Sequence, residues 1–160
     1  SDVIDIGTSD YKYKDLYLSG GVYLGGTGSA NYLDFYEEGT WTIVSGSGSN
    51  PLSVQGTGNR YTRIGRQVIA YFDITWNSGN TGTGTAIITG LPFLPSSDHE
   101  GDGAATIGYI TGTAGVDFVI HCSNSATQML FYVDGSGGSS TYAQLAGRRI
   151  AGYIQYYTNA

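Results

Sequence analysis

The sequence predicts an all-β protein whose larger part is an antiparallel, jelly-roll-like β-sandwich. Three observations support this prediction. No stretch shows the apolar spacing and capping residues of an amphipathic helix. Short stretches instead alternate between apolar and polar residues, as half-buried strands do. The composition, with 26 Gly and 14 Tyr among 160 residues and only 12% charged residues, favours short strands joined by tight turns.

The clearest strand is predicted over residues 67–76. Its even positions, from Val68 to Trp76, are apolar, whereas its odd positions include Tyr71 and Asp73. Successive side chains of a strand point to opposite faces, so one face of this strand is predicted to be buried and the other to be exposed to solvent.

Further strands are predicted before and after this one. Gly65 and Arg66 are expected to form the turn of a hairpin that leads into it. With residues 67–76 the chain then has roughly eight strands in about 120 residues, the spacing of an antiparallel sandwich or barrel. The other predicted strands are residues 40–45, 60–65, 85–93, 104–111, 116–122, 128–135 and 148–157.

Two parts of the chain differ in character: a Gly-rich segment over residues 1–33 and a head domain over residues 34–160. The first segment alternates like short strands but offers each strand only about two aliphatic side chains. At about 25 cal/mol per Å² this burial does not offset the backbone entropy lost on ordering. Several copies wound around one axis would supply the missing core, so a short intertwined β shaft is predicted.

Charge and cysteine content exclude several classes of protein. The net charge of −6 with only 7 Lys and Arg argues against a nucleic-acid partner. The lone Cys122 cannot form an internal disulfide. No apolar run approaches the roughly 18 residues that membrane insertion requires, and no signal peptide is evident. A chain that begins at Ser1 rather than Met is expected to be part of a longer protein.

Two motifs resemble the C-terminal region of tail fibre and related virion proteins of tailed bacteriophages. There a shaft repeat like G-[ST]-S-x-x-[FYW]-K-D-L-Y-L-S-G leads into L-D-[DF]-Y-E-E-G-T-W-T. This chain carries the first as GTSDYKYKDLYLSG at residues 7–20 and the second as LDFYEEGTWT at residues 33–42. The elements YTRIGRQV at 61–68 and ITGLPF at 88–93 are also similar to pieces of such fibres.

The resemblance implies a homotrimeric fibre in the virion, joined to the rest of the phage tail fibre. Its globular head would lie at the distal fibre tip. There it would bind a host bacterial surface glycan or an outer-membrane protein during adsorption.

Paired carboxylates are the first candidate for chemistry, because enzymes that cleave glycans use two of them. Glu37 and Glu38 are adjacent, so in an extended segment they point to opposite sides. Together with Asp34 they are interpreted as part of the junction between the two segments, bonding backbone groups. His121 and Cys122 also face opposite sides, and Cys122 is interpreted as a small core residue.

The acidic loop around residues 98–102 contains Asp98, His99, Glu100 and Asp102. It lacks the alternating ligand pattern of a Ca²⁺ loop, so a solvated loop is favoured over a metal site, and no cofactor is expected. Gly-rich runs at 46–50, 79–85 and 135–142 are interpreted as turns rather than phosphate cradles, since no helix follows them.

Aromatic residues are the main indication of a binding site. Sugars bind flat Tyr and Trp faces through their C–H surfaces, while neighbouring polar groups bond the hydroxyls. The alternative is that these Tyr side chains pack against a core or a neighbouring subunit. Variable loops at 46–58, 79–84, 96–103, 123–127 and 135–146 are further candidates for contact. The predicted receptor-binding residues are Tyr142, Tyr153, Tyr109, Tyr132, Asp98 and His99.

The sequence therefore predicts a receptor-binding fibre tip that binds but does not catalyse, with no catalytic or metal site. Two alternatives stay open. A structural or decoration protein of the virion would form stable trimers without affinity for host cells. A polysaccharide depolymerase would need acidic groups that converge between subunits.

Overall fold

The computed structural model describes residues 6–57, 59–98, 102–112, 118–122, 126–133 and 138–159. The chain divides into two compact units, Ser1–Asp34 and Phe35–Ala160. His99 and Glu100 lie outside the described residues. Among the described helices, none is long and apolar enough to cross a membrane.

The described part of the N-terminal unit contains one small antiparallel ladder. Strand β1 (Val22–Tyr23) pairs with β2 (Tyr32–Leu33), and a 3-10 turn, η1 (Ser29–Asn31), lies between them. The rings of Tyr23 and Tyr32 are 4.8 Å apart. None of the described residues of this unit is buried.

Residues 11–18, part of the segment that alternates like short strands, form no strand in this single chain. A strand needs a partner for its backbone hydrogen bonds, and the described part of the N-terminal unit offers residues 11–18 no partner strand.

The second unit is one large antiparallel sheet. Its strands follow the order β3-β6-β7-β12-β9-β10-β11-β8-β4, and β5 pairs with the end of β7 that β6 leaves free. The bounds are β3 Tyr36–Thr40, β4 Val44–Ser45, β5 Leu52–Val54, β6 Arg60–Ile64, β7 Gln67–Trp76, β8 Ile87–Thr89, β9 Ala104–Ile110, β10 Phe118–Cys122, β11 Gln128–Val133 and β12 Arg149–Tyr157.

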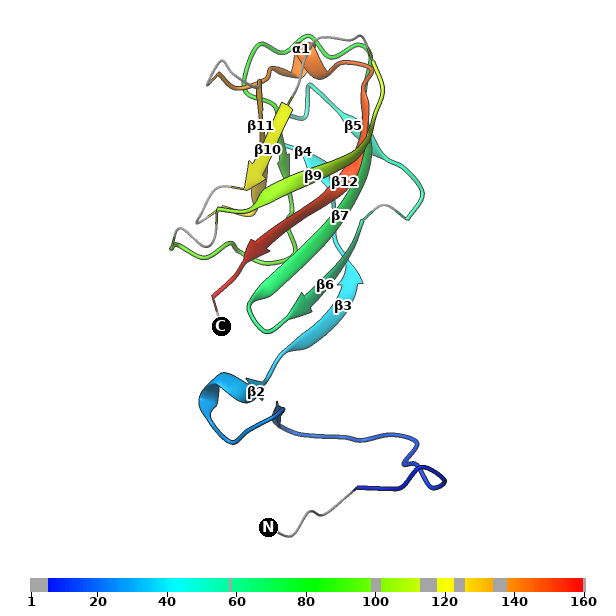
Figure 1. Ribbon diagram of the computed structural model, residues 1–160. Helices are drawn as coiled ribbons and strands as arrows, with labels where there is room; N and C mark the ends of the chain where they lie inside the picture. Colours follow the sequence, from blue (N-terminus) through cyan, green and yellow to red (C-terminus); the bar gives the residue numbers. More distant parts are fainter. Residues whose placement is uncertain are drawn as a thin grey trace. The chain divides into compact units, whose positions relative to one another are not determined.

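The predicted all-β antiparallel class is confirmed. The sheet curls over itself, so that β11 packs against the inner face of β7 (Figure 1). The strands of the second unit belong to one continuous sheet, where the sequence predicted the two sheets of a sandwich. The reason is β9, which pairs with β12 on one side and with β10 on the other. It therefore joins the strands from β3 to β12 and the strands from β10 to β4 into one hydrogen-bonded sheet.

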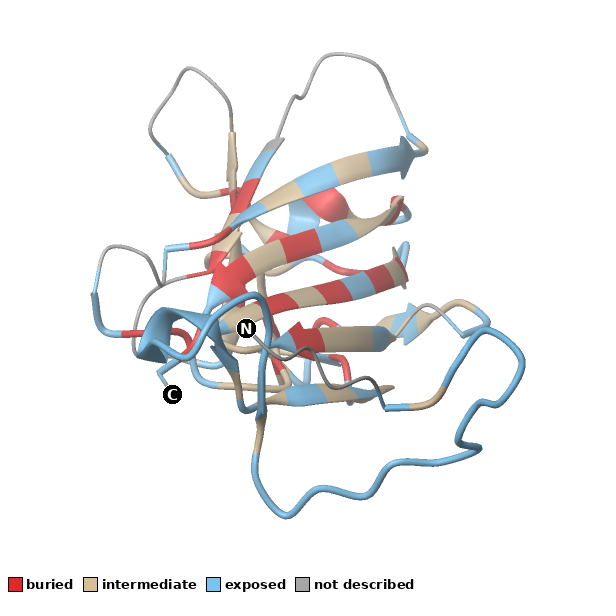
Figure 2. Cartoon of the chain, turned by 60° about the horizontal axis from the view of Figure 1, so that its bottom comes forward, coloured by how far each residue is buried: buried red, intermediate tan, exposed pale blue. Residues whose placement is uncertain are grey.

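The hairpin of β6 and β7 forms as predicted. Ile64 pairs with Gln67 across a two-residue turn, and Gly65 takes the positive φ of 55° that such turns require. Along β7 the even positions are buried and the odd ones more exposed, an alternation that Figure 2 shows on the neighbouring strands as well. The register of β7 therefore fixes which side chains reach the outer face.

One core lies inside the curl of the sheet. Trp76 of β7 meets Phe131 of β11 edge-on, with ring centroids 5.8 Å apart. It also meets the ring of Tyr142 edge-on, with centroids 5.5 Å apart. The largest fully buried side chains are Trp76, Tyr156, Phe72, Phe131, Ile74, Ile88, Ile120, Met129, Leu145, Ile150, Ile154 and Val68.

Four elements differ from the sequence prediction. Strands β3 and β5 lie in stretches predicted as a junction and a loop. Of the predicted strand 40–45 only Val44–Ser45 is a strand, because Trp41 and Ile43 turn into the core instead. A short helix, α1 (Tyr142–Leu145), was also missed, although Thr141 and Gln144 form its capping box.

Candidate ligand-binding groove

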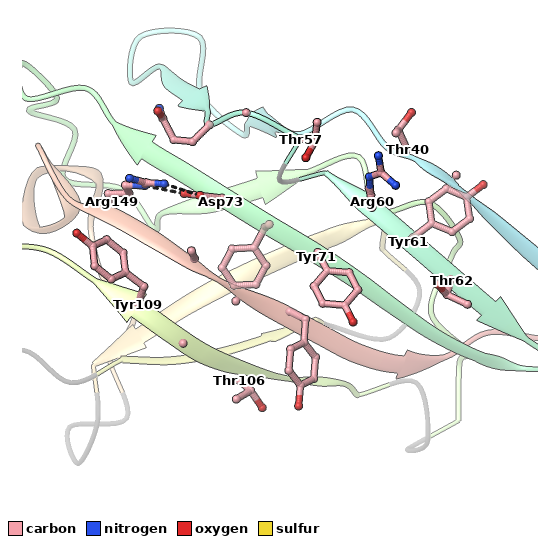
Figure 3. A pocket seen from close by; sticks show the side chains of 18 of the residues that line it. Thr40, Thr57, Arg60, Tyr61, Thr62, Tyr71, Asp73, Thr106, Tyr109 and Arg149 are labelled. Atoms are coloured by element: carbon pink, nitrogen blue, oxygen red, sulfur yellow. Dashed lines mark hydrogen bonds and ion pairs between the residues drawn. The ribbon is translucent and has the colours of Figure 1, made fainter.

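A groove of about 1170 Å³ lies on the outer face of the sheet, on the side away from the core (Figure 3). Strands β3, β6, β7, β12 and β9 form its floor, and residues 55–57 form part of one wall. The groove lies within the second unit. Its lining is mostly Tyr, Thr and Gly with four charged side chains, which are Glu38, Arg60, Asp73 and Arg149.

One row of paired residues crosses the groove, which we call the groove row: Thr40, Arg60, Tyr71, Tyr153 and Thr106. The pairs Thr40–Arg60, Tyr71–Tyr153 and Tyr153–Thr106 lie directly opposite each other in the sheet register. Tyr61 of β6 pairs with Ala70 of β7. Arg60, one residue before Tyr61, therefore lies beside Tyr71, one residue after Ala70. Five strands thus each place one polar or aromatic side chain in a line.

The centre of the groove row is a pair of tyrosines. The ring centroids of Tyr71 and Tyr153 are 5.8 Å apart, with an angle of 54° between the planes. The two residues are 48% and 36% exposed, so their rings are accessible from the groove. Opposed positions on neighbouring strands bring side chains together in this way, and here they create an aromatic surface on the sheet.

A β-bulge places Tyr109 beside this pair. On β9, Ile107 pairs with Gly152 and Tyr109 pairs with Ala151, which leaves Gly108 as an extra residue. Without a bulge, residues three apart on a strand point to opposite faces. Because of the extra residue, Thr106 and Tyr109 both line the groove.

Gly152 permits the close approach of the two strands at this bulge. A Cβ atom at position 152 would lie 2.1 Å from the backbone oxygen of Thr106. Any larger residue would have to push β9 away from β12. The aim of Tyr109 into the groove therefore depends on a glycine in the neighbouring strand.

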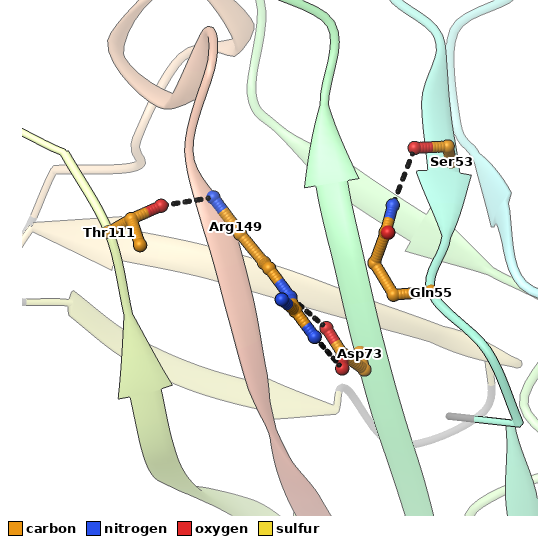
Figure 4. A network of polar contacts seen from close by, with 5 residues as sticks. All are labelled: Ser53, Gln55, Asp73, Thr111 and Arg149. Atoms are coloured by element: carbon orange, nitrogen blue, oxygen red, sulfur yellow. Dashed lines mark hydrogen bonds and ion pairs between the residues drawn. The ribbon is translucent and has the colours of Figure 1, made fainter.

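Two of the residues that line the groove, Arg149 and Asp73, form an ion pair (Figure 4). Arg149 donates through Nε to Asp73 Oδ1 at 2.9 Å and through Nη2 to Oδ2 at 2.7 Å. The hydrogen bond to Asp73 raises the pKa of Arg149 above its usual value. The backbone N–H of Arg149 donates to Thr111 Oγ1 at 3.1 Å, and its guanidinium lies 5.5 Å from the ring centroid of Tyr109. Both oxygens of Asp73 are therefore bonded within the groove.

The two neighbouring glutamates point to opposite faces, as predicted. Glu38 lines the groove and accepts a hydrogen bond from the Tyr36 hydroxyl, whereas Glu37 accepts one from the Tyr61 hydroxyl. These bonds raise the pKa of both tyrosines. The predicted bonds to backbone groups are thus corrected, because β3 is a strand whose backbone is already paired with β6.

Of the predicted receptor-binding residues, Tyr109 and Tyr153 line the groove. Tyr132 does not. Its ring stacks on His121 at 4.9 Å on the β10–β11 pair, away from the groove lining. Asp98 is exposed, and its backbone N–H donates to Ser96 Oγ at 3.3 Å. His99 lies outside the described residues.

Tyr142 was predicted in an exposed polar loop, and this placement is wrong. It is the first residue of helix α1, only 5% exposed, with its ring against Trp76. The capping box starts a turn of helix at this point, and the turn directs the ring into the core. Tyr142 therefore presents no flat face to a ligand.

His121 and Cys122 face opposite sides, as predicted. Cys122 is fully buried, and burial raises the pKa of its thiol to about 11. The ring of His121 stacks outside on Tyr132, and its Nδ1 lies 3.0 Å from the backbone oxygen of Cys122. A thiol with this pKa is protonated at neutral pH and is not an activated nucleophile.

Sequence reasoning missed four groove residues: Arg60, Tyr71, Asp73 and Arg149. Tyr71 and Asp73 could have been found, since the alternation of residues 67–76 already put both on the outer face. The pairing of Arg149 with Asp73 joins residues that are 76 positions apart, so no local signal predicts it. Among the described residues, no group of three His, Cys, Asp or Glu side chains could hold a metal ion.

Comparisons with known proteins support the fold. No family model matches the chain, and a search of curated proteins finds no match. The second unit is a curled, antiparallel all-β domain with a groove on its outer face. A solved structure, the crystal structure of the Dettilon tailspike protein (gp208), is similar, with a TM-score of 0.58 at 15% sequence identity. The match covers 78% of this chain and 24% of the tailspike, so the chain spans about a quarter of that protein's length.

Proposed function

We propose that this chain is a host-recognition part of a bacteriophage tail that binds a bacterial surface glycan in the groove. The motifs at residues 7–20 and 33–42 support a tail protein, as does the fold that the chain shares with a phage tailspike. The observation that carries the proposal is the groove row, in which two accessible tyrosines lie between an arginine and threonines.

The groove offers the chemistry that sugars need. A pyranose ring has apolar C–H faces and a rim of hydroxyls. The rings of Tyr71 and Tyr153 provide apolar faces, while Thr40, Thr62 and Thr106 provide hydroxyls that can bond those of the sugar. Such an open groove accommodates a chain of sugars better than a small enclosed ligand.

We propose binding without catalysis. Glycoside hydrolysis requires one carboxylic acid that protonates the leaving group and a second carboxylate on the other side of the bond. In the groove Asp73 accepts two hydrogen bonds from Arg149, and Glu38 accepts one from Tyr36. Both oxygens of Asp73 are thus held by one guanidinium and one oxygen of Glu38 by a tyrosine, which suits these carboxylates poorly as a free acid and base pair on either side of a bond.

A homotrimer is part of the proposal. Large apolar side chains in the N-terminal unit are exposed, among them Tyr17 at 91% and Tyr11 at 80%. Three intertwined copies would cover such side chains and provide residues 11–18 with strand partners. The second unit would then be carried at the distal end of a tail fibre.

Cell binding tests the proposal against its two alternatives. Fluorescently labelled protein is titrated onto a panel of bacterial strains and onto their extracted surface polysaccharides. We expect saturable binding to at least one strain and its polysaccharide. A virion decoration protein would bind no strain, and a depolymerase would release new reducing ends from the bound polymer. Either of these results contradicts the proposal.

A matched pair of tyrosines on β12 tests the groove itself. Tyr153 lines the groove at 36% exposure, whereas Tyr157 is equally exposed at 38% and is not part of its lining. Tyr153→Ala removes an aromatic face, so we expect about tenfold weaker binding to the polysaccharide. Tyr157→Ala is expected to bind like the unchanged chain. Equal effects of the two substitutions would place the binding site elsewhere.

A further inference from the structure

We infer that the ligand of the groove is an acidic glycan, and that Arg60 binds its carboxylate or phosphate group. This inference rests on the proposed function, because it specifies the class of sugar that the groove binds. It arises from the charges of the groove rather than from its aromatic residues.

Of the four groove charges, Arg149 and Asp73 neutralise each other through two hydrogen bonds. Glu38 accepts a hydrogen bond from the Tyr36 hydroxyl, a neutral group that does not compensate the charge of a carboxylate. The side chain of Arg60 is exposed and has no hydrogen bond or ion pair with any of the described residues. Arg60 is therefore the groove cation that is available to an anionic ligand.

The position of Arg60 suits a substituent on a stacked sugar. It lies in the groove row between Thr40 and Tyr71. Directly opposed residues on neighbouring strands have Cβ atoms about 5 Å apart. A sugar that covers the ring of Tyr71 would thus place an exocyclic acid group within reach of the Arg60 guanidinium.

The surroundings of Arg60 also fit an anion. Figure 3 shows Thr57 and Thr40 on the same side of the groove as Arg60. Their hydroxyls can donate hydrogen bonds to a carboxylate or phosphate oxygen. The planar guanidinium matches both of these anions with two parallel donors, a geometry that a lysine cannot reproduce.

The overall charge makes this role testable. With a net charge of −6, the chain repels polyanions at long range and gains little from unspecific attraction. Binding of an acidic polymer would therefore depend on the local contact with Arg60. A neutral ligand, in contrast, would leave Arg60 hydrated, and its removal would change little.

The experiment uses surface polysaccharides from the strain panel, each in three forms. One form is native, one has its carboxyl groups chemically reduced to alcohols, and one has its phosphodiesters removed with aqueous hydrogen fluoride. Affinities for the full chain are measured by calorimetry. Loss of binding after carboxyl reduction identifies a uronate-type ligand, and loss after dephosphorylation identifies a phosphate-substituted one. Either loss supports the inference.

Variants of Arg60 assign the effect to this residue. For the acidic polymer we expect about tenfold weaker binding of Arg60→Gln, and partial recovery in Arg60→Lys. Lys14→Gln is the matched control, because it also removes one positive charge but lies in the N-terminal unit. It is expected to bind like the unchanged chain.

The outcomes separate this inference from the proposed function. Equal binding of all three polymer forms, or an unchanged affinity of Arg60→Gln, overturns the acidic ligand and leaves glycan binding intact. If the unchanged chain binds no polysaccharide of the panel, the proposed function itself fails. An equal loss in Arg60→Gln and Lys14→Gln would indicate general electrostatics and would also overturn the role of Arg60.

Discussion

Tyr71 and Tyr153 occupy directly opposed positions on β7 and β12, and their rings lie 5.8 Å apart on the outer face of the sheet. Both side chains are exposed within the same groove. They are thus neighbours that would contact the same part of a ligand, and each ring also limits the orientations of the other.

This proximity predicts that the two tyrosines act together in binding. We expect Tyr71→Ala and Tyr153→Ala each to weaken polysaccharide binding. The binding free energy that the double variant loses should be smaller than the sum of the losses in the two single variants. Residues in contact commonly show interaction energies of about 0.5–3 kcal/mol, whereas distant pairs are additive. A double-mutant cycle by calorimetry measures this, with Tyr153 and Tyr157 as a second, more separated pair. Strict additivity for Tyr71 and Tyr153 would contradict a shared contact.

The bulge of β9 predicts an unusual sensitivity at Gly152. A Cβ atom there would lie 2.1 Å from the Thr106 backbone oxygen, so Gly152→Ala has to displace one of the two strands. We expect the free energy of unfolding to fall by about 1–3 kcal/mol. The matched control is Gly48→Ala, since a Cβ at position 48 meets no atom within 4 Å.

Urea denaturation measures both glycine variants. Polysaccharide binding of Gly152→Ala should weaken as well, because the bulge directs Tyr109 into the groove. If Gly152→Ala and Gly48→Ala unfold at the same urea concentration, the close strand approach at the bulge is not present in solution.

Buried Cys122 predicts a loss of stability at alkaline pH. Burial raises the pKa of its thiol from the ordinary value of 9.0 to about 11. The unfolded chain therefore releases this proton first, so the stabilisation is present below pH 9 and is lost as the pH rises towards 11. Burial also raises the pKa of Tyr156, which acts in the same direction at still higher pH.

Urea denaturation at pH 8 and at pH 10.5 in the presence of a reductant checks this prediction. The free energy of unfolding should be lower at the higher pH. In Cys122→Ala this difference should shrink but persist, because Tyr156 still titrates. In the folded chain at pH 8, a thiol reagent should react with Cys122 far more slowly than in guanidinium chloride. An identical pH dependence of Cys122→Ala would exclude the thiol as a cause.

Local patterns in the sequence predict most of the longer strands, whereas β3 and β5 were missed. The alternation of residues 67–76 gives the buried face of β7, and Gly65 gives its hairpin turn. The order of the strands in the sheet could not be predicted from local patterns. The pairing of β9 with β12 joins residues that are distant in the sequence. One continuous curled sheet and a two-sheet sandwich have the same local alternation, so the pattern cannot separate them.

The candidate site was only partly predictable for the same reason. Tyr109 and Tyr153 are candidates from the sequence because they are aromatic and lie on predicted strands, and both line the groove. The face on which Tyr109 lies depends on a bulge, and a bulge is set by the partner strand. The burial of Tyr142 follows from a single turn of helix, for which the capping residues Thr141 and Gln144 were the available signal.

The exposed apolar side chains of the N-terminal unit predict that several copies of the chain associate. Its apolar side chains are exposed, with Leu16 at 70% and Tyr13 at 73%, and at about 25 cal/mol per Å² this surface favours contact with further copies. We expect light scattering to give the mass of a trimer for the full chain, and a smaller mass or weaker association for a chain that begins at Asp34. Leu16→Ser in the full chain should weaken the trimer without unfolding the second unit, which circular dichroism can verify, since the two units are separately compact. A full chain that is monomeric at all concentrations would contradict the fibre, and the groove would then have to be studied as the site of an isolated domain.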